Sequence, residues 1–302
     1  MRAGFVATSR RLLKPFAISL GFLVAIAALD GCSNHGHPVP TTLFKTIRVP
    51  ADAPTIQAAI DFADGGDTIL VTDGIYRGPG NRDIDLIHKI LVILSENGPG
   101  TTIIDCGGSE DAQHGGFTYE QVGHNGSVLD GFTIRNAYRN EGAAILLYGS
   151  SPRISNCVLA NNHATVSGGA IKVKGSSPPV SNCTIINNSC NSGAAIFGLA
   201  GSTPRFDNCI IAFNDSSDVM VANEATTNFT LSCCDVFGNS HGDFVGDIES
   251  MQDAAGNFSS DPLVCELGFD YHLETRSPCT ADLSPCGQLV GALDIGCPSP
   301  PK

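Results

Sequence analysis

Short runs of alternating apolar and polar residues recur along most of the chain. The run at 170–174 (AIKVK) alternates strictly, which is typical of a half-buried strand. More continuously apolar runs at 67–71, 90–94 and 102–105 also predict strands. Gly, Ser and Pro separate the runs. The pattern therefore predicts many short strands joined by tight turns.

Part of this pattern repeats with a nearly constant period. The aligned segments are VLDGFTIRNA (128–137), SPRISNCVLANN (151–162), SPPVSNCTIINN (177–188), TPRFDNCIIAFN (203–214) and NFTLSCCDVFGN (228–239). Successive copies lie 25 or 26 residues apart, which indicates stacked structural units. Helical repeats such as ankyrin are disfavoured because the segments lack helical periodicity. Leucine-rich repeats are disfavoured because their spacing of Leu and Asn does not match these segments. Two or three short strands per coil, stacked in register, is what remains.

Two columns of the alignment are expected to be structural. The first column contains Phe132 in the earliest copy and cysteines in the others: Cys157, Cys183, Cys209 and Cys234. We expect these side chains to point into the interior of the coils, with the cysteines mostly reduced, because a thiol is small and soft. Asparagines occupy the second column, where stacked amides satisfy each other and the backbone: Asn162, Asn188, Asn214 and Asn239. We also expect this asparagine column to supply the left-handed residue of a turn.

The segment before the first strands has helical spacing. Residues 55–61 (TIQAAID) predict a short helix that covers the open end of the first coil. An uncovered coil end is a sheet edge and needs protection.

Several segments resemble the pectin-lyase-like superfamily. IRVPADAPTIQAAIDFADGGDTILVTDGIY (47–76) is similar to its entry segment, LDGFTIRN (129–136) and SNCTIINN (181–188) to its repeats, and SSDPLVCELGFDYHLETRSPC (259–279) with GALDIGC (291–297) to the closing segment of bacterial secreted β-helix proteins. The resemblance implies an all-β fold, a single-stranded right-handed parallel β-helix with an N-terminal capping helix and a disulfide-stapled C-terminal cap. The polygalacturonase and pectinesterase catalytic motifs are missing, and no diagnostic lyase motif is visible.

The N-terminus reads as a targeting segment. Arg10, Arg11 and Lys14 precede an apolar run at 16–29, which has the length of a signal-peptide core. The sequence LDGC (29–32) resembles a bacterial lipobox, with Cys32 as the residue to be acylated and Asp30 as a departure from the motif. The expected division is a lipoprotein signal peptide (1–32), a tether (33–44), the β-helix (45–245) and the C-terminal cap (246–302). The alternative is ordinary cleavage and a free secreted protein.

Composition agrees with a protein of many short strands. Hydrophobic residues make up 42% of the chain, charged residues only 16%, and the formal net charge is −13. This acidity disfavours nucleic acid and anionic lipid as partners, so the membrane is expected to be contacted through the lipid anchor only.

Four cysteines gather near the C-terminus: Cys265, Cys279, Cys286 and Cys297. An oxidising compartment permits disulfides, and four cysteines allow three connectivities. We favour Cys279 with Cys286 and Cys265 with Cys297, which would staple a cap over the last coil. A zinc site is less favoured because no Cys-x-x-Cys spacing occurs.

Candidate chemistry lies in the outward columns, where the coils differ. Lys172 and Lys174 share one outward face, and Lys174 aligns with Tyr148 of the preceding coil. An aromatic ring beside a cation suits a sugar that carries a carboxylate. An outward Arg or Lys of the middle coils could contact a ligand or act as a lyase base, and the candidates are Arg135, Arg139, Lys172 and Lys174. The competing interpretation is that lysines here only keep the sheet soluble.

Two carboxylate pairs are weaker candidates. Asp83 and Asp85 flank Ile84 and would point to one face of a strand, where Asp105, Glu110 and Asp111 could join them around calcium. Glu141 and Asp130 could form a hydrolytic pair, although nothing in the sequence fixes their separation.

The sequence thus predicts an envelope-anchored, extracytoplasmic β-helix protein whose solenoid face binds a polysaccharide or an envelope protein. The expected location is the outer membrane or cell surface. The alternative is a uronate polysaccharide lyase that uses an Arg or Lys base and calcium.

Overall fold

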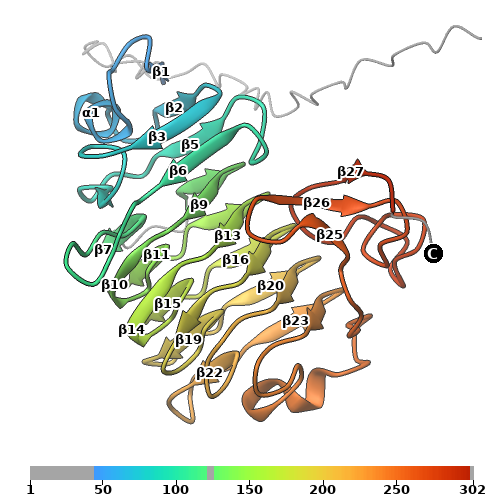
Figure 1. The fold of residues 1–302 in the computed structure, drawn as a ribbon. Helices are drawn as coiled ribbons and strands as arrows, with labels where there is room; N and C mark the ends of the chain where they lie inside the picture. Colours follow the sequence, from blue (N-terminus) through green and yellow to red (C-terminus); the bar gives the residue numbers. More distant parts are fainter. Residues whose placement is uncertain (1–43, 121–125, 300–302) are drawn as a thin grey trace, which may run out of the picture. The chain divides into compact units, whose positions relative to one another are not determined.

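The computed structural model describes residues 44–120 and 126–299. Figure 1 shows the chain winding through successive coils, each of which adds one short strand to two or three parallel sheets. The described residues also form two short helices: α1 (Ile56–Phe62) and the 3-10 helix η1 (Gly246–Met251). The all-β parallel solenoid predicted from the repeat is confirmed.

Four parallel sheets, named A to D, form the walls of the solenoid, and a small mixed sheet E lies in the C-terminal segment. Sheet A contains β1 (Thr46–Val49), β2 (Thr68–Val71), β5 (Val92–Ser95), β8 (Val128–Asp130), β12 (Arg153–Ser155), β16 (Pro179–Ser181), β20 (Arg205–Asp207) and β23 (Thr230–Ser232). Sheet B contains β3 (Gly74–Arg77), β6 (Thr102–Asp105), β9 (Thr133–Arg135), β13 (Val158–Ala160), β17 (Thr184–Ile186), β21 (Ile210–Ala212) and β24 (Asp235–Phe237). Sheet C contains β4 (Ile84–Asp85), β7 (Phe117–Glu120), β11 (Ile145–Tyr148), β15 (Ile171–Lys174), β19 (Ile196–Leu199) and β22 (Met220–Ala222). Sheet D contains β10 (Tyr138–Glu141), β14 (His163–Ser167) and β18 (Ser189–Cys190), and sheet E contains β25 (Val264–Glu266), β26 (Asp270–Glu274) and β27 (Ile295–Cys297).

Both ends of the solenoid core are covered. At the first coil, α1 begins after Thr55, whose side chain accepts a hydrogen bond from the Ala58 backbone N–H. Its residues Ile56 and Ile60 are fully buried, so the predicted capping helix is confirmed. At the other end, Ile248 of η1 joins the same hydrophobic core. Neither end therefore exposes the apolar interior.

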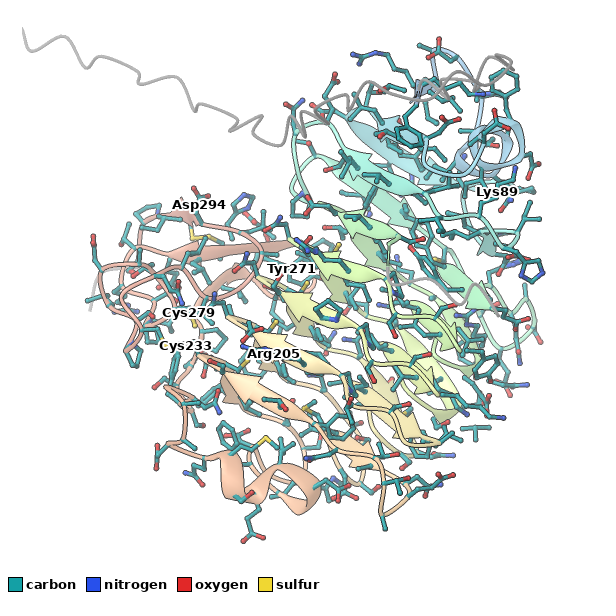
Figure 2. The ribbon with its side chains drawn as sticks, turned by 180° about the vertical axis from the view of Figure 1, so that it is seen from behind. Lys89, Arg205, Cys233, Tyr271, Cys279 and Asp294 are labelled. Carbon is teal, nitrogen blue, oxygen red and sulfur yellow. A yellow bond between two sulfur atoms is a disulfide. The ribbon has the colours of Figure 1, made fainter. Side chains whose placement is uncertain are left out.

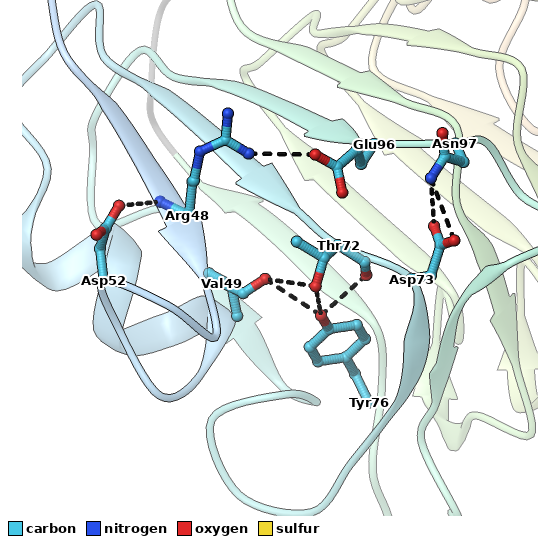
Figure 3. Close-up of polar contacts among 8 residues, drawn as sticks. All are labelled: Arg48, Val49, Asp52, Thr72, Asp73, Tyr76, Glu96 and Asn97. Atoms are coloured by element: carbon cyan, nitrogen blue, oxygen red, sulfur yellow. Dashed lines mark hydrogen bonds and ion pairs between the residues drawn. The ribbon is translucent and has the colours of Figure 1, made fainter.

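The first coil is also pinned by polar contacts (Figure 3). The Tyr76 hydroxyl donates to the carbonyl oxygen of Thr72 at 2.9 Å and lies 3.3 Å from that of Val49. On the outer side, the Arg48 guanidinium pairs with Glu96 at 3.2 Å. These contacts join strands of three successive coils.

The repeat columns take the predicted inward positions. Phe132 and the four aligned cysteines are fully buried, and the cysteines are free thiols. The buried asparagines form a ladder: the Oδ1 of Asn188 accepts from the Asn162 backbone N–H, and the Asn214 Oδ1 accepts from that of Asn188, both at 3.0 Å. This ladder satisfies backbone groups that no strand pairs.

One expectation about these asparagines is wrong. The ladder residues do not supply the left-handed conformation, which falls on outward residues one or more positions earlier: Asn156, Asn161, Asn182, Asn187 and Asn208, with φ between 50° and 55°. The ladder amides must point inward, whereas a left-handed residue turns the chain at a corner. The inward asparagine column therefore forms the ladder, and two other asparagine columns supply the left-handed corners.

The C-terminal segment (residues 258–299) lies along the outer face of sheet B rather than over the last coil. Figure 2 shows Tyr271 and Cys279 where this segment meets the strands. The outward residues of sheet B there are apolar and pack against it: Val158, Ala160, Ile186, Ile210 and Ala212. The Gly291 N–H donates to the Asn208 carbonyl at 2.8 Å, and the Asn161 amide donates to the Tyr271 hydroxyl at 2.8 Å. The apolar face of sheet B explains why the segment folds back.

Two disulfides staple this segment, but only one was expected. Cys265 pairs with Cys297 as predicted, whereas Cys286 pairs with Cys233 and not with Cys279. The Cys279 thiol is buried on the side of the segment that faces sheet B, 3.1 Å from an Asp235 carboxylate oxygen, and it does not pair with Cys286. Cys233 occupies the left-handed corner position (φ 53°) that asparagine fills in other coils, so its side chain points outward to the segment.

Candidate functional site on the outward face of sheet C

Register brings the predicted sugar-contact residues together on sheet C. Tyr148 of β11 pairs with Lys174 of β15, and Leu146 pairs with Lys172, which in turn pairs with Phe197 of β19. Inward residues between them, such as Ile171 and Val173, are fully buried. Strand alternation therefore places the aromatic and cationic side chains side by side on the outward face.

Glu141 lies at the centre of this group. Its Oε1 is 2.5 Å from the Lys172 ammonium, and its Oε2 accepts from the Tyr148 hydroxyl at 2.9 Å. Burial disfavours the Glu141 charge, but the hydrogen bonds from Lys172 and Tyr148 outweigh it and hold the pKa of Glu141 below its usual value. Burial, and next the bond to Glu141, raises the pKa of Tyr148 to about 12. The group is therefore an ionised carboxylate held between an ammonium and a neutral phenol.

The two lysines differ in how far they reach solvent. The Lys172 side chain is only 8% exposed, and its ammonium also lies 5.4 Å from the centre of the Phe197 ring. Lys174 is exposed, with its ammonium 5.7 Å from the centre of the Tyr148 ring. A shallow depression runs beside this pair, with Gly149 and Gly175 in its lining. Lys174 and the Tyr148 ring are thus the parts of the group that a ligand can touch.

Arg139 borders the same face, but its guanidinium is already hydrogen-bonded to protein acceptors. Its guanidinium donates to the Thr118 hydroxyl at 3.2 Å and to the backbone carbonyls of Gly142 and Phe117. Loss of solvation lowers the pKa of Arg139. Together with Glu141 it lines a second depression, on the sheet D side of the face. The contacts indicate a residue that shapes the face.

Arg135 does not join this group. It lies on β9 in sheet B, where its guanidinium pairs with Asp105 at 3.2 Å. Asp105 also binds Arg77 and the Asn136 amide, so it is not available to the predicted calcium site. The sequence correctly predicts that Arg135 lies on the middle coils, but it does not predict which sheet of the solenoid carries it.

The pair of Asp83 and Asp85 is not arranged as predicted. Asp83 is in the left-handed region (φ 52°) before β4, so strand alternation does not apply to it. Its carboxylate binds His114 Nδ1 at 2.7 Å and the Gly115 N–H, whereas Asp85 accepts from the backbone N–H of Ile87. Within residues 44–120 and 126–299, no group of three or more His, Cys, Asp or Glu side chains could hold a metal ion.

The second carboxylate pair is also separated. Asp130 lies on sheet A and binds Ser155 and Asn156, whereas Glu141 lies on sheet D. Their strands form different walls of the solenoid, which does not suit a shared hydrolytic role. The predicted lipidation site, Cys32, lies outside the described residues.

Phe197 was missed from the sequence, and Glu141 was named there only as a hydrolytic partner of Asp130, not as part of this face. Phe197 could have been found, because it stands 25 residues after Lys172 in the same outward column. Glu141 could not have been found by column, because sheet D has a register irregularity between Arg139 and Glu141.

Comparison with known proteins supports the fold. A family model described as right handed beta helix region matches residues 91–253. No curated protein and no solved structure matches the chain. Among the helices that the structure describes, none has the length and hydrophobicity to cross a membrane.

Proposed function

Because this chain belongs to the right-handed β-helix family, we propose that it is an exported protein that uses the outward face of sheet C to bind an acidic polysaccharide. The observation that carries the proposal is the exposed Lys174 ammonium over the Tyr148 ring, beside a carboxylate that Lys172 already neutralises. A flat parallel sheet offers several coils to an extended chain.

The chemistry of the face suits a sugar that carries a carboxylate. The Tyr148 ring can lie against the apolar face of a pyranose. The Lys174 ammonium can pair with the carboxylate on that ring, because Glu141 is already held by Lys172 and Tyr148. The formal net charge of −13 repels a polyanion as a whole, so the attraction of this face for a carboxylate has to come from the local Lys174 ammonium.

We expect Lys174→Ala to weaken binding of a soluble polyuronate about tenfold, because a charge-assisted hydrogen bond is lost. Titration calorimetry with polygalacturonate, and with its carboxyl-reduced neutral counterpart, measures the effect. Arg205→Ala is the matched control, since Arg205 is an exposed cation on sheet A. Equal weakening by both variants, or no binding of any uronate polymer, would contradict the proposal.

The same titrations test a lyase. Unsaturated products that absorb in the ultraviolet would establish lyase activity instead of binding alone. The contacts of Lys172 and Arg139 do not favour this outcome, because both cations are committed to protein acceptors.

Export and anchoring form a separate part of the proposal. The two disulfides, Cys233–Cys286 and Cys265–Cys297, suit an oxidising compartment. The basic and apolar N-terminal pattern ahead of Cys32 supports lipidation in the cell envelope.

We expect Cys32→Ser to move the protein from the membrane fraction to the soluble fraction of a bacterial host, because the acylation site is lost. Immunoblots of the two fractions measure the distribution. A Ser33→Ala variant, which keeps the cysteine, is the control. Unchanged partitioning of Cys32→Ser would refute the anchor.

A further inference from the structure

An apolar groove lies on the surface of the C-terminal segment. It forms where residues 280–289 lie beside the start of β27, and it has a volume of about 210 Å³. Pockets that enclose a whole small molecule usually measure about 300–1,000 Å³, so this groove suits a single side chain of a larger partner. Its lining residues are Thr280, Ala281, Asp282, Leu289, Asp294 and Ile295.

Two large apolar side chains are exposed in this groove or next to it. Ile295 lines the groove and is 49% exposed, and Leu283 follows directly after the lining residue Asp282 and is 54% exposed. On the other side of the segment, Leu273 and Val290 are fully buried against the apolar residues of sheet B. The segment therefore has one apolar side that sheet B covers and a smaller one that no described residue covers.

Disulfides hold both stretches of the groove in place. The bond between Cys265 and Cys297 fixes the end of β27, and the bond between Cys233 and Cys286 fixes the other stretch to the solenoid. A groove that is already rigid loses little conformational entropy when a partner binds. The staples thus favour binding at an apolar surface that would otherwise be free to collapse.

The charge around the groove favours a cationic partner. Asp282 and Asp294 both line it and are exposed, and neither carboxylate has a hydrogen bond or an ion pair with another described residue (Asp294 is labelled in Figure 2). Arg276 is the only Lys or Arg in the sequence from 258 to 299, and it pairs with Glu274 at 3.4 Å. The same stretch contains six acidic residues: Asp261, Glu266, Asp270, Glu274, Asp282 and Asp294.

We propose that this groove binds a basic segment of a partner protein. An aliphatic side chain of the partner enters the groove beside Leu289 and Ile295, and lysine or arginine residues next to it pair with Asp282 and Asp294. A concave groove suits an inserted side chain better than a lipid surface, and the surrounding carboxylates repel anionic lipid. The site is separate from the face of sheet C, because the segment that carries it packs on sheet B. Either site can bind while the other does not.

The test is fluorescence polarisation of the full exported chain with three labelled peptides. GKKLKKG presents a leucine between lysines, GKKSKKG replaces the leucine with serine, and GEELEEG replaces the lysines with glutamate. We expect GKKLKKG to bind about tenfold more tightly than either counterpart, because only it can both fill the groove and pair with the two carboxylates. No binding of GKKLKKG, or equal binding of either counterpart, would overturn the proposal.

A double variant tests the charges. Asp282→Asn combined with Asp294→Asn should weaken GKKLKKG about threefold to tenfold, because two exposed ion pairs are lost. The matched control is Glu110→Gln combined with Asp111→Asn, which removes two exposed charges from a loop before β7. Equal weakening by the two double variants would show only a general attraction of the acidic chain for a cationic peptide, and it would contradict the site.

A single variant tests the apolar part of the groove. Ile295→Ser should weaken GKKLKKG about threefold, because part of the apolar contact is lost. Ile75→Ser is the matched control, since Ile75 is also an exposed isoleucine but lies on β3. Equal effects of the two variants would refute the proposed contact. Co-sedimentation with phosphatidylcholine vesicles that Ile295→Ser abolishes would assign the groove to a membrane instead of a protein.

Discussion

Replacing Asn188 by alanine should lower the free energy of unfolding by about 3–5 kcal/mol, one of the largest effects of a single substitution in this chain. Asn188 is fully buried, and its Oδ1 accepts from both the backbone N–H and the side-chain amide of Asn162, each at 3.0 Å. Its own amide donates to the Leu159 carbonyl at 2.9 Å. Alanine would leave the buried Asn162 N–H without an acceptor and without water, at about 1–3 kcal/mol, and it would remove one donor from the Leu159 carbonyl.

Equilibrium unfolding in urea measures this loss. Asn191→Ala is the matched control, because Asn191 is an exposed asparagine of the next coil corner whose amide donates to the Thr165 carbonyl. We expect that variant to lose less than about 1 kcal/mol. A loss for Asn188→Ala no larger than for Asn191→Ala would show that the ladder does not stabilise the coils. In a solenoid, a broadened or stepwise transition would localise the damage to the central coils.

The solenoid was predictable because its pairing is parallel and in register. Because equivalent residues of successive coils stack directly, residues 25 or 26 positions apart in the sequence are neighbours in the sheet. Cys157 and Cys183 could thus be placed inside, and Tyr148 could be placed beside Lys174, from the alignment alone. The same alignment also indicates that Cys233 points outward, because the adjacent Cys234 belongs to the inward cysteine column.

The C-terminal segment was not predictable in this way because it does not repeat. Its contacts join residues far apart in the sequence, such as Asn161 with Tyr271, and no period encodes them. The choice of Cys233 over Cys279 as the partner of Cys286 depends on where that segment docks. Local rules also failed at Asp83, where a left-handed backbone replaced the expected strand geometry.

The outward faces of the solenoid divide into two kinds. Sheet B presents apolar residues from Val158 to Ala212, and the C-terminal segment covers them. Sheet C presents Tyr148, Lys172 and Lys174, and it carries depressions on its outward side. The difference follows from the outward columns, whose residues are not constrained by the core. The outward columns, unlike the inward ones, therefore give each wall its own surface chemistry.

Raising the pH from 5 to 8 is expected to destabilise the protein by about 2–3 kcal/mol through Asp235. Asp235 is fully buried on β24 beneath the C-terminal segment. Burial raises its pKa to about 7, the neighbouring charges of Asp243 and Asp261 act in the same direction, and the bonds from the Ser260 N–H and the Cys279 thiol act against it. In the unfolded chain the pKa of an aspartate is about 3.9.

The sign follows from proton binding. Between about pH 4 and pH 7 the folded chain keeps a proton on Asp235 that the unfolded chain has lost, so stability falls as pH rises through this window and levels off above it. Asp235→Asn should remove the dependence and be more stable than the parent at pH 8, because an uncharged amide replaces a buried carboxylate while its oxygen still accepts from Ser260. Urea unfolding of both proteins at pH 5, 6, 7 and 8 makes the comparison, and groups that titrate in both proteins cancel in the difference. Parallel curves for the two proteins, or a parent that gains stability relative to Asp235→Asn as pH rises, would show that Asp235 is already ionised beneath the segment.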